Sequence, residues 1–259
     1  MATDHAFKPL TFYNAQGLDP IHTDWCGYLH SPDDVCGLTI EEHQHVAPYD
    51  KHFYDTIRPG VQASAAAVVP RIIELIHPEK VIDVGCGEGW WAHEFSRNGC
   101  EVIGVDGSYV EGSPLGDRFI PHDLRRPLPA HLAGRFDLAV CLEVAEHLDQ
   151  RYADRFVHDL SVLAEVILFS AAIPGQGGAG HANEQWPAYW VQRFARHGFH
   201  ASGALRLEFW EDDRVENWYR QNLIVFAQLP SLYPALFKTP LATPWPLVHP
   251  VLYNARRSH

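Results

Sequence analysis

Val81-Ile-Asp-Val-Gly85-Cys-Gly87-Glu-Gly89-Trp-Trp91 is the stretch that decides the fold of this 259-residue chain. Its first four residues form an apolar run with β-branched side chains, which is typical of a fully buried strand. Glycines at 85, 87 and 89 then break the run, and a helical pattern follows. A strand, a glycine turn and a helix form the first unit of a doubly wound nucleotide-binding fold, in which glycine lets the backbone approach a ligand closely.

The glycine spacing separates this chain from the dinucleotide-binding enzymes. Their fingerprint is Gly-x-Gly-x-x-Gly, whereas here the third glycine comes one position early, because residue 90 is tryptophan. Asp83 lies inside the expected strand, two residues before the first glycine. The pattern Val-x-Asp-x-Gly-x-Gly-x-Gly resembles motif I of the class I S-adenosylmethionine (AdoMet)-dependent methyltransferases. The resemblance implies that AdoMet is the cofactor, and the spacing disfavours a nicotinamide-dependent oxidoreductase.

A second strand that ends in an acid supports the resemblance. The apolar run from Glu101 ends at Asp106, about 20 residues past the glycines, where a carboxylate can accept hydrogen bonds from a ribose diol. In the family an aspartate after the third strand typically meets the adenine amino group, and the next backbone N–H meets the ring. The resemblance gives these two roles to Asp123 and Leu124. The complete expected cofactor-binding set is Asp83, Gly85, Cys86, Gly87, Gly89, Asp106, Gly107, Asp123, Leu124 and Cys141.

Composition limits the class of protein. The sequence is 46% hydrophobic, which suffices for one α/β domain with an added segment, and no apolar run approaches the ~20 residues of a membrane span. No charged-then-apolar signal peptide opens the chain, so we expect a cytoplasmic protein that does not bind membranes. The formal net charge of −12 argues against nucleic acid as a partner, because such proteins usually carry a basic face.

The order of apolar runs predicts an α/β fold, a Rossmann-like seven-stranded methyltransferase sheet with helices on both faces. We expect an N-terminal arm and lid at 1–60, an AdoMet-dependent methyltransferase core at 61–228 and a C-terminal surface tail at 229–259. Two late strands with no long helix between them predict the terminal antiparallel hairpin of the methyltransferase sheet. Strands are expected at 81–84, 101–105, 118–124, 135–143, 166–170, 204–210 and 221–228, and helices at 62–76, 88–98, 144–164 and 185–197.

Two aromatic segments flank the expected site. In methyltransferases of this type the segment before the core often folds over the cofactor, and simple packing on the sheet is the alternative. Candidate lid residues are Tyr49, His52 and Tyr54. Aromatic side chains after the fifth strand could exclude water from the acceptor, although core packing explains the last of them equally well. These candidate wall residues are Trp186, Tyr189 and Trp190.

A Glu-x-x-Glu-His sequence follows the fourth strand, at the edge of the sheet where this fold class binds ligands. On a helix its spacings would put Glu143, Glu146 and His147 on one face. Converging carboxylates repel unless a proton or a cation lies between them. The sequence resembles the same stretch in the O-methyltransferases of ubiquinone biosynthesis and in the small-RNA 3′-end 2′-O-methyltransferases. In the second branch another histidine comes from the loop after the fifth strand, where this chain has His181.

Three interpretations of this cluster remain open. Glu143, Glu146, His147 and His181 could hold a divalent cation (Mg, Mn, Fe or Zn) that lowers the pKa of a substrate hydroxyl. Without a metal, His147 or His181 could act as the catalytic general base. Alternatively the second glutamate and the first histidine are solvated helix residues.

We therefore predict an enzyme that moves a methyl group from AdoMet to a small-molecule acceptor, at a hydroxyl oxygen. An RNA 3′-end 2′-O-methyltransferase and a non-catalytic AdoMet-binding protein are the alternatives. The sequence makes no prediction of the oligomeric state or of the acceptor's identity.

Overall fold

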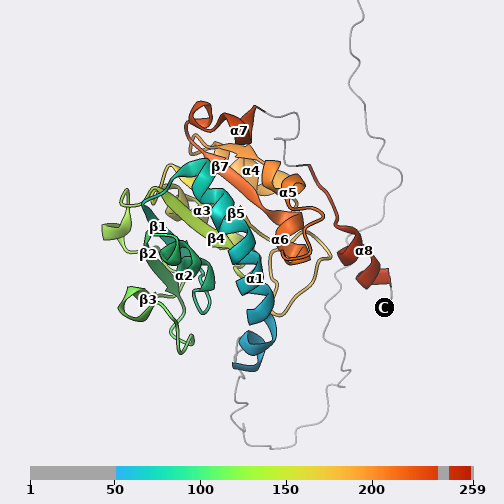
Figure 1. The fold of residues 1–259 in the computed structure, drawn as a ribbon, viewed down its shortest axis with the longest axis horizontal. Helices are drawn as coiled ribbons and strands as arrows, with labels where there is room; N and C mark the ends of the chain where they lie inside the picture. The colour runs from blue at the N-terminus through green and yellow to red at the C-terminus, as the bar shows by residue number, and fades with distance from the viewer. Residues whose placement is uncertain (1–50, 239–244, 258–259) are drawn as a thin grey trace, which may run out of the picture. The chain divides into compact units, whose positions relative to one another are not determined.

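The computed structural model describes residues 51–238 and 245–257, which form a seven-stranded sheet with helices on both faces (Figure 1). The strand order is β3-β2-β1-β4-β5-β7-β6. Strands β1 to β5 are parallel, and β7 runs antiparallel to both β5 and β6. The predicted fold class and its terminal antiparallel hairpin are confirmed. The strands are β1 (Lys80–Val84), β2 (Glu101–Asp106), β3 (Phe119–Pro121), β4 (Leu138–Leu142), β5 (Val166–Ser170), β6 (His200–Ser202) and β7 (Ile224–Ala227).

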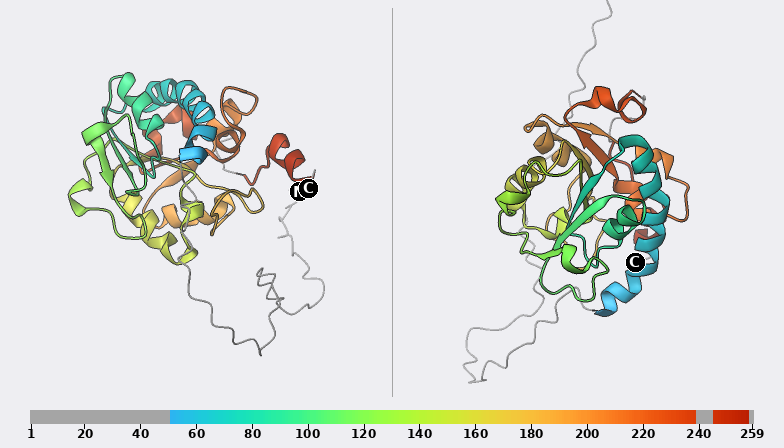
Figure 2. Two further views of the ribbon diagram at one scale, coloured as in Figure 1. Left: turned by 90° about the horizontal axis from the view of Figure 1, so that it is seen from below. Right: turned by 60° about the vertical axis from the view of Figure 1, so that its left-hand side comes forward.

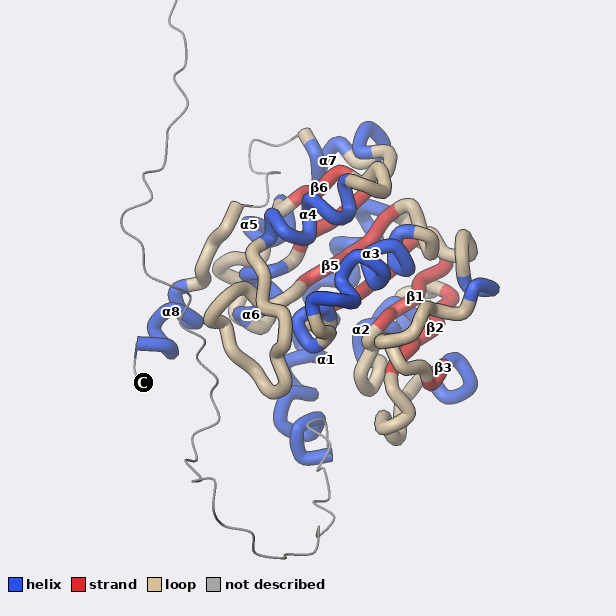
Figure 3. The backbone as a smooth tube through the Cα atoms, turned by 180° about the vertical axis from the view of Figure 1, so that it is seen from behind, coloured by secondary structure: helices blue, strands red, loops and turns tan. Residues whose placement is uncertain are grey.

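Helices α1, α2, α5 and α6 cover one face of the sheet, and α3 and α4 cover the other (Figures 1 and 3). Helix α8 lies at the periphery of the molecule (Figure 2). Among the described residues, none of the helices combines the length and the apolar character needed to cross a bilayer. The α-helices are α1 (Lys51–Ile76), α2 (Trp90–Arg97), α3 (Ala153–Ser161), α4 (Pro187–Ala195), α5 (Ala204–Glu208), α6 (Asn217–Asn222), α7 (Pro234–Phe237) and α8 (Pro250–Arg257).

Each face of the sheet has its own apolar core. Successive side chains of a strand point to opposite faces, so Val81 and Val140 join the core under α1 and α2, whereas Ile82 joins the core under α3 and α4. All three side chains are fully buried, and each such burial contributes about 1.5–3 kcal/mol. These two cores hold the strand ends, and therefore the loops that follow them, in place.

The sixth predicted strand is wrong. Residues 204–208 form α5, and the strand lies earlier, at His200–Ser202. The alternating pattern of 204–210 also suits a helix, because Leu205 and Phe209, four residues apart, both enter the core under α1. The seventh strand is shorter than predicted, since residues 217–222 form α6.

The helix predicted at 144–164 is also wrong in its first half. Two 3₁₀ turns, at Ala145–His147 and Gln150–Tyr152, precede α3. Glu143 has a φ of +54°, so the chain leaves β4 in a left-handed conformation and does not enter an α-helix. Conversely, α1 is continuous although Pro59 and Pro70 lie inside it, and it begins at Lys51, so the boundary expected at residue 60 falls within a helix.

The segment expected to be a surface tail contains two short helices. Leu236 on α7 is 1% exposed and belongs to the core under α1. His249, directly before α8, is also buried, and its backbone N–H donates to Gln221 Oε1 over 2.8 Å. The segment is therefore anchored to the core at Leu236 and His249, while α8 itself is largely exposed. Of the arm and lid expected at 1–60, residues 1–50, which include Tyr49, lie outside the described residues.

Candidate active site

The glycine turn after β1 adopts a backbone that only glycine enters easily. Gly85, Gly87 and Gly89 have φ values of +76°, +52° and +92°. A Cβ on Gly85 would lie 2.3 Å from Val144 Cγ2, so this glycine also permits close approach of the segment after β4. Gly89 precedes α2 and does not line the cavity described below, so its role is to start the helix.

Asp106 at the end of β2 is the acceptor for three hydrogen bonds. Its Oδ2 accepts from the Gly87 N–H at 2.7 Å, and its Oδ1 accepts from the Gly107 N–H and the Tyr109 hydroxyl, both at 2.6 Å. The residue is 6% exposed but lines the cavity. The two predicted motifs, the glycine turn and the acid about 20 residues later, therefore meet through a direct hydrogen bond.

Asp83 lies in the same cavity wall but deeper. Its Oδ2 accepts a hydrogen bond from the Ala92 N–H at 3.3 Å. Burial raises the pKa of Asp83 to about 7, the Ala92 N–H opposes that rise and the charge of Asp106 adds to it. Asp83 is therefore partly protonated near neutral pH.

The predicted adenine residues follow β3. Asp123 and Leu124 both line the cavity. The carboxylate of Asp123 accepts hydrogen bonds from the backbone N–H and the guanidinium of Arg125, and these contacts lower its pKa although partial burial opposes them. Cys141 of the predicted set is fully buried in the core under α3 and α4, away from the cavity, because its position in β4 directs its side chain to that face.

The first turns of α1 form one wall over the glycine turn. Tyr54 Cε1 would lie 3.2 Å from a Cβ on Gly87, so the ring packs directly on that glycine. Arg58 donates to both carboxylate oxygens of Glu88, at 2.8 and 2.6 Å, and so ties the helix to the turn. Of the candidate lid residues, Tyr54 lines the cavity and His52 is exposed and does not.

One cavity of about 820 Å³ joins these residues to the predicted catalytic residues His147 and His181. Several further lining residues come from α1, α6 and α8 and were not predicted from the sequence. They include Phe53, Ile57, Trp218, Tyr219 and Leu252. The candidate wall residues Trp186, Tyr189 and Trp190 do not line it, since Trp190 is 2% exposed in the core under α4 and Trp186 is directed outward.

Glu143, the first residue after β4, lines the cavity and is held by amide groups. Its carboxylate accepts hydrogen bonds from Gln176 Nε2 at 3.0 Å and from Asn222 Nδ2 at 3.1 Å. Burial raises the pKa of Glu143, while these amide donors and the neighbouring Glu146 carboxyl lower it. The amide partners were missed in the sequence, because they come from the loop after β5 and from α6.

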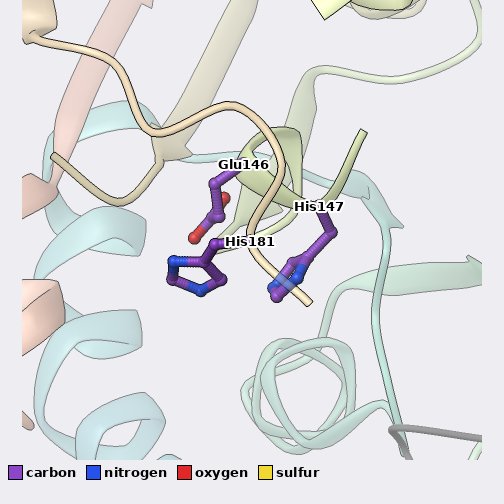
Figure 4. A group of neighbouring side chains, drawn as sticks. All are labelled: Glu146, His147 and His181. Carbon is purple, nitrogen blue, oxygen red and sulfur yellow. The ribbon is translucent and has the colours of Figure 1, made fainter. Parts of the chain in front are cut away.

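Glu146, His147 and His181 form a compact group (Figure 4). One ligand atom from each lies within 4.8 Å of the others, and the ring centroids of the histidines are 4.7 Å apart. The structure does not bring Glu143 into this group, which corrects the predicted four-residue set. Glu143 precedes the 3₁₀ turn Ala145–His147 and has a left-handed φ of +54°, so the two glutamates do not lie on one continuous helical face.

The hydrogen bonds of this group fix its orientation. Ala172 N–H donates to Glu146 Oε1 at 3.1 Å, whereas Oε2 is buried with no hydrogen-bond partner among the described residues. His181 Nδ1 lies 2.8 Å from Glu184 Oε1, and Glu184 also accepts from the N–H groups of Gly175 and Gly177. Glu184 was not singled out in the sequence, although its His-x-x-Glu spacing from His181 is a usable signal.

The protonation states follow from burial. Burial, reinforced by the nearby charge of Glu143, raises the pKa of Glu146 well above its usual value. Burial and then the charge of His181 lower the pKa of His147 to about 4, so this imidazole is neutral at pH 7. Burial opposes ionisation of Glu184, but the hydrogen bonds from His181 and two glycine N–H groups outweigh it and lower the pKa of Glu184.

Comparison with known proteins identifies the fold and family. A solved structure of a candidate O-methyltransferase from Nostoc punctiforme superposes with a TM-score of 0.50 and 14% identity, over 68% of this chain and 58% of that one, which shows the shared fold alone. The ubiquinone biosynthesis O-methyltransferase of Psychrobacter cryohalolentis is 35% identical over 80 residues, covering 27% of this chain and 31% of the relative. That of Chromobacterium violaceum is 32% identical over 81 residues, covering 27% and 34%.

This chain thus spans about a third of the length of the curated relatives it matches. A family model described as a methyltransferase domain matches residues 55–212, which is more than half of the sequence and includes the glycine turn, Asp106, His147 and His181. The chain therefore belongs to the methyltransferase domain family of class I AdoMet-dependent methyltransferases.

Proposed function

We propose that this protein transfers the methyl group of AdoMet to a hydroxyl oxygen of a small-molecule acceptor. The observation that carries the proposal is the single cavity that contains Asp106 and the glycine turn together with His147 and His181. Methyl transfer from a sulfonium requires the nucleophile to lie behind the methyl group with water excluded, and such positioning is worth ~7–11 kcal/mol. A cavity that reaches both groups of residues suits that requirement.

His181 is the candidate general base. An ionised carboxylate only accepts hydrogen bonds, so the contact with Glu184 requires the proton of His181 to be on Nδ1. Nε2 then carries the free lone pair and can accept the proton of a substrate hydroxyl. His147, neutral at pH 7, lies beside it and could accept a second hydrogen bond from the substrate.

The same residues fit a divalent cation. The buried Glu146 Oε2 without a partner among the described residues, together with the two imidazoles of His147 and His181, is a donor set that suits Mn, Fe or Zn. Glu146, His147 and His181 would hold the ion, and Glu184 would orient His181 from behind. A bound cation would lower the pKa of the acceptor hydroxyl and orient it.

The cavity has an apolar part that suits a small, partly apolar acceptor. Phe53, Ile57, Trp218 and Leu252 line it, and the net charge of −12 disfavours a polyanionic acceptor such as RNA. The two relatives whose names specify O-methylation support oxygen as the acceptor atom. A cytoplasmic location stays a prediction from the sequence.

Titration calorimetry with AdoMet and its product S-adenosylhomocysteine (AdoHcy) tests the cofactor. Tritium transfer from labelled AdoMet to a panel of phenols, catechols and aliphatic alcohols, with a short RNA as a separate arm, then tests the acceptor class. We expect micromolar binding and transfer to at least one hydroxyl compound. Folded protein that binds neither nucleoside would refute the proposal, and binding without any transfer would indicate a non-catalytic AdoMet-binding protein.

Calorimetric titration of the chelator-treated protein with Mn²⁺ or Zn²⁺ tests the cation. Glu146→Gln should abolish binding, whereas Glu143→Gln, the matched control outside the three-residue group, should retain it. Equal loss in both variants would support the four-residue set predicted from the sequence. Absence of cation binding to the unaltered protein would leave His181 as a metal-free base.

A further inference from the structure

Tyr109 makes a contact that the methyltransferase motifs do not include. It lies three residues after Asp106, and its hydroxyl donates to Asp106 Oδ1 over 2.6 Å. Its ring packs on Gly107, where an added Cβ would lie 2.0 Å from Tyr109 Cε1. Tyr109 also lines the cavity, and its side chain is on the exposed side of the turn, with 46% of its surface accessible.

The contact matters because an ionised carboxylate has a limited number of acceptor sites, about four in all. Three donors of the described chain already use Asp106: the N–H groups of Gly87 and Gly107 and the Tyr109 hydroxyl. One site then remains, whereas a ribose diol brings two hydroxyl groups. Bidentate binding of the ribose therefore requires one of the three donors to leave.

Only one of these donors belongs to a side chain; the other two are backbone N–H groups. The Gly87 N–H is part of the glycine turn, whose Gly85 N–H is bonded to Val105 O at 2.7 Å. The Gly107 N–H directly follows β2 and cannot leave without moving that strand end. Tyr109 is a side chain on an exposed turn, and a rotation about its χ1 bond takes its hydroxyl away from Asp106.

We propose that the Tyr109 hydroxyl competes with the cofactor ribose for Asp106, so that Tyr109 sets the affinity of this site for AdoMet and AdoHcy. In the free protein the hydroxyl takes the place of one ribose hydroxyl and keeps the carboxylate satisfied. On binding, the ring turns outward and the diol takes both remaining sites. The inference rests on the proposed use of AdoMet and adds a residue that controls its affinity.

The test is calorimetric titration of the full chain with AdoHcy, comparing the unaltered protein with Tyr109→Phe. The variant keeps the ring and removes only the competing donor, so we expect AdoHcy to bind about five- to tenfold more tightly, as for loss of one hydrogen bond of ordinary net strength. Tyr233→Phe is the matched control, because that tyrosine does not line the cavity, and it should not change the affinity.

A second ligand makes the test specific to the ribose. With the 2′,3′-dideoxy analogue of AdoHcy, which brings no hydroxyl to Asp106, Tyr109→Phe and the unaltered protein should bind equally. Affinity for AdoHcy that is unchanged within twofold, or weaker, in Tyr109→Phe would overturn the inference, since the hydroxyl would then be neutral or a partner of the nucleoside. Failure of both proteins to bind AdoHcy would instead refute the cofactor assignment and the inference with it.

Discussion

The two ends of the cavity, which we propose hold the cofactor and the acceptor, are built in different ways. At the cofactor end, Gly87 and Asp106 are 19 residues apart and meet because β1 and β2 are adjacent parallel strands. At the acceptor end, Glu143 is held by Asn222, 79 residues away, and by Gln176 from a different loop. The end around Gly87 and Asp106 is a local motif with its own sequence pattern. The end around Glu143 is assembled from three separate parts of the chain, which share no sequence pattern.

The two ends also differ in how they hold charge. At the cofactor end, backbone N–H groups satisfy Asp106. At the proposed acceptor end, Glu143 is partly exposed to the cavity and the neighbouring Glu146 is fully buried, and desolvation raises the pKa of both. The strained φ of +54° at Glu143 lies at this second end, and such strain, which costs of order 1–3 kcal/mol, is common where function requires a particular side-chain position.

His181→Ala should have the largest effect and should separate the two ends. Loss of a general base or metal ligand lowers the rate by ~100- to 10,000-fold. We expect the initial rate of tritium transfer to fall in this range while the calorimetric affinity for AdoHcy stays within twofold. His131→Ala, on an exposed 3₁₀ turn, is the control. A parallel loss of AdoHcy affinity would show that the two ends are not independent.

Asp106→Ala should affect the opposite end. Removing the carboxylate takes away two hydrogen bonds to the ribose, so the affinity for AdoHcy should fall by about 100-fold. Calorimetry measures the change, and Asp117→Ala, an exposed acid near the same loop, should bind normally. Retention of affinity in Asp106→Ala would contradict the placement of the ribose at the end of β2.

Asp83→Asn should change how the unfolding free energy depends on pH, because it replaces a buried acid with a group that does not titrate. With a folded pKa of about 7, above that of an unfolded aspartate near 3.8, native Asp83 holds a proton that the unfolded chain has lost, so its stabilising contribution falls as pH rises. Between pH 5 and 8 the unaltered protein should lose about 2–3 kcal/mol of unfolding free energy relative to Asp83→Asn. Urea unfolding at both pH values measures this difference.

The low pKa of His147 has the opposite effect on the unfolding free energy over part of the same pH range. Its folded pKa is about 4, below the usual 6.5, so protonation of the unfolded chain weakens the fold as pH falls below 6.5. Because His147 is present in both proteins, its contribution cancels in the difference between them. A difference that does not vary with pH would contradict the raised pKa of Asp83.

Gly85→Ala should have the smallest effect and tests how tightly the two ends are packed together. Gly85 and Gly134 both have positive φ, so alanine strains the backbone at each. At Gly85 the added Cβ would also meet Val144, whereas at Gly134 no described atom lies within 4 Å of it. We expect Gly85→Ala to lower the unfolding free energy by about 1–3 kcal/mol more than Gly134→Ala. If urea unfolding gave the same loss of unfolding free energy for both variants, the segment after β4 would have to move aside to accommodate the added methyl group.

Prediction from the sequence succeeded where a pattern of residues is compatible with only one kind of local structure. The glycine turn after β1, the acids at 106 and 123 after the next two strands, and the seven-stranded sheet follow from short patterns, and the structure has these elements where they were expected. It failed at 204–208, where an alternating pattern over a few residues fits a strand and a helix equally well. It also failed at Cys141, because the burial of a strand residue does not say which face of the sheet it occupies.

The sequence by itself determined the family, the sheet and the residues at the ends of β1 and β2, because adjacent parallel strands bring their carboxyl ends together wherever the glycines and acids stand in order. Only the tertiary structure decided that Glu143 lies outside the group of Glu146, His147 and His181, and that Trp218 and Leu252 line the same cavity. These outcomes depend on a left-handed residue and on contacts between segments far apart in the chain. Neither feature produces a recognisable pattern in the sequence. The backbone angle of Glu143 and the hydrogen bond from the Asn222 amide both depend on how the surrounding residues pack.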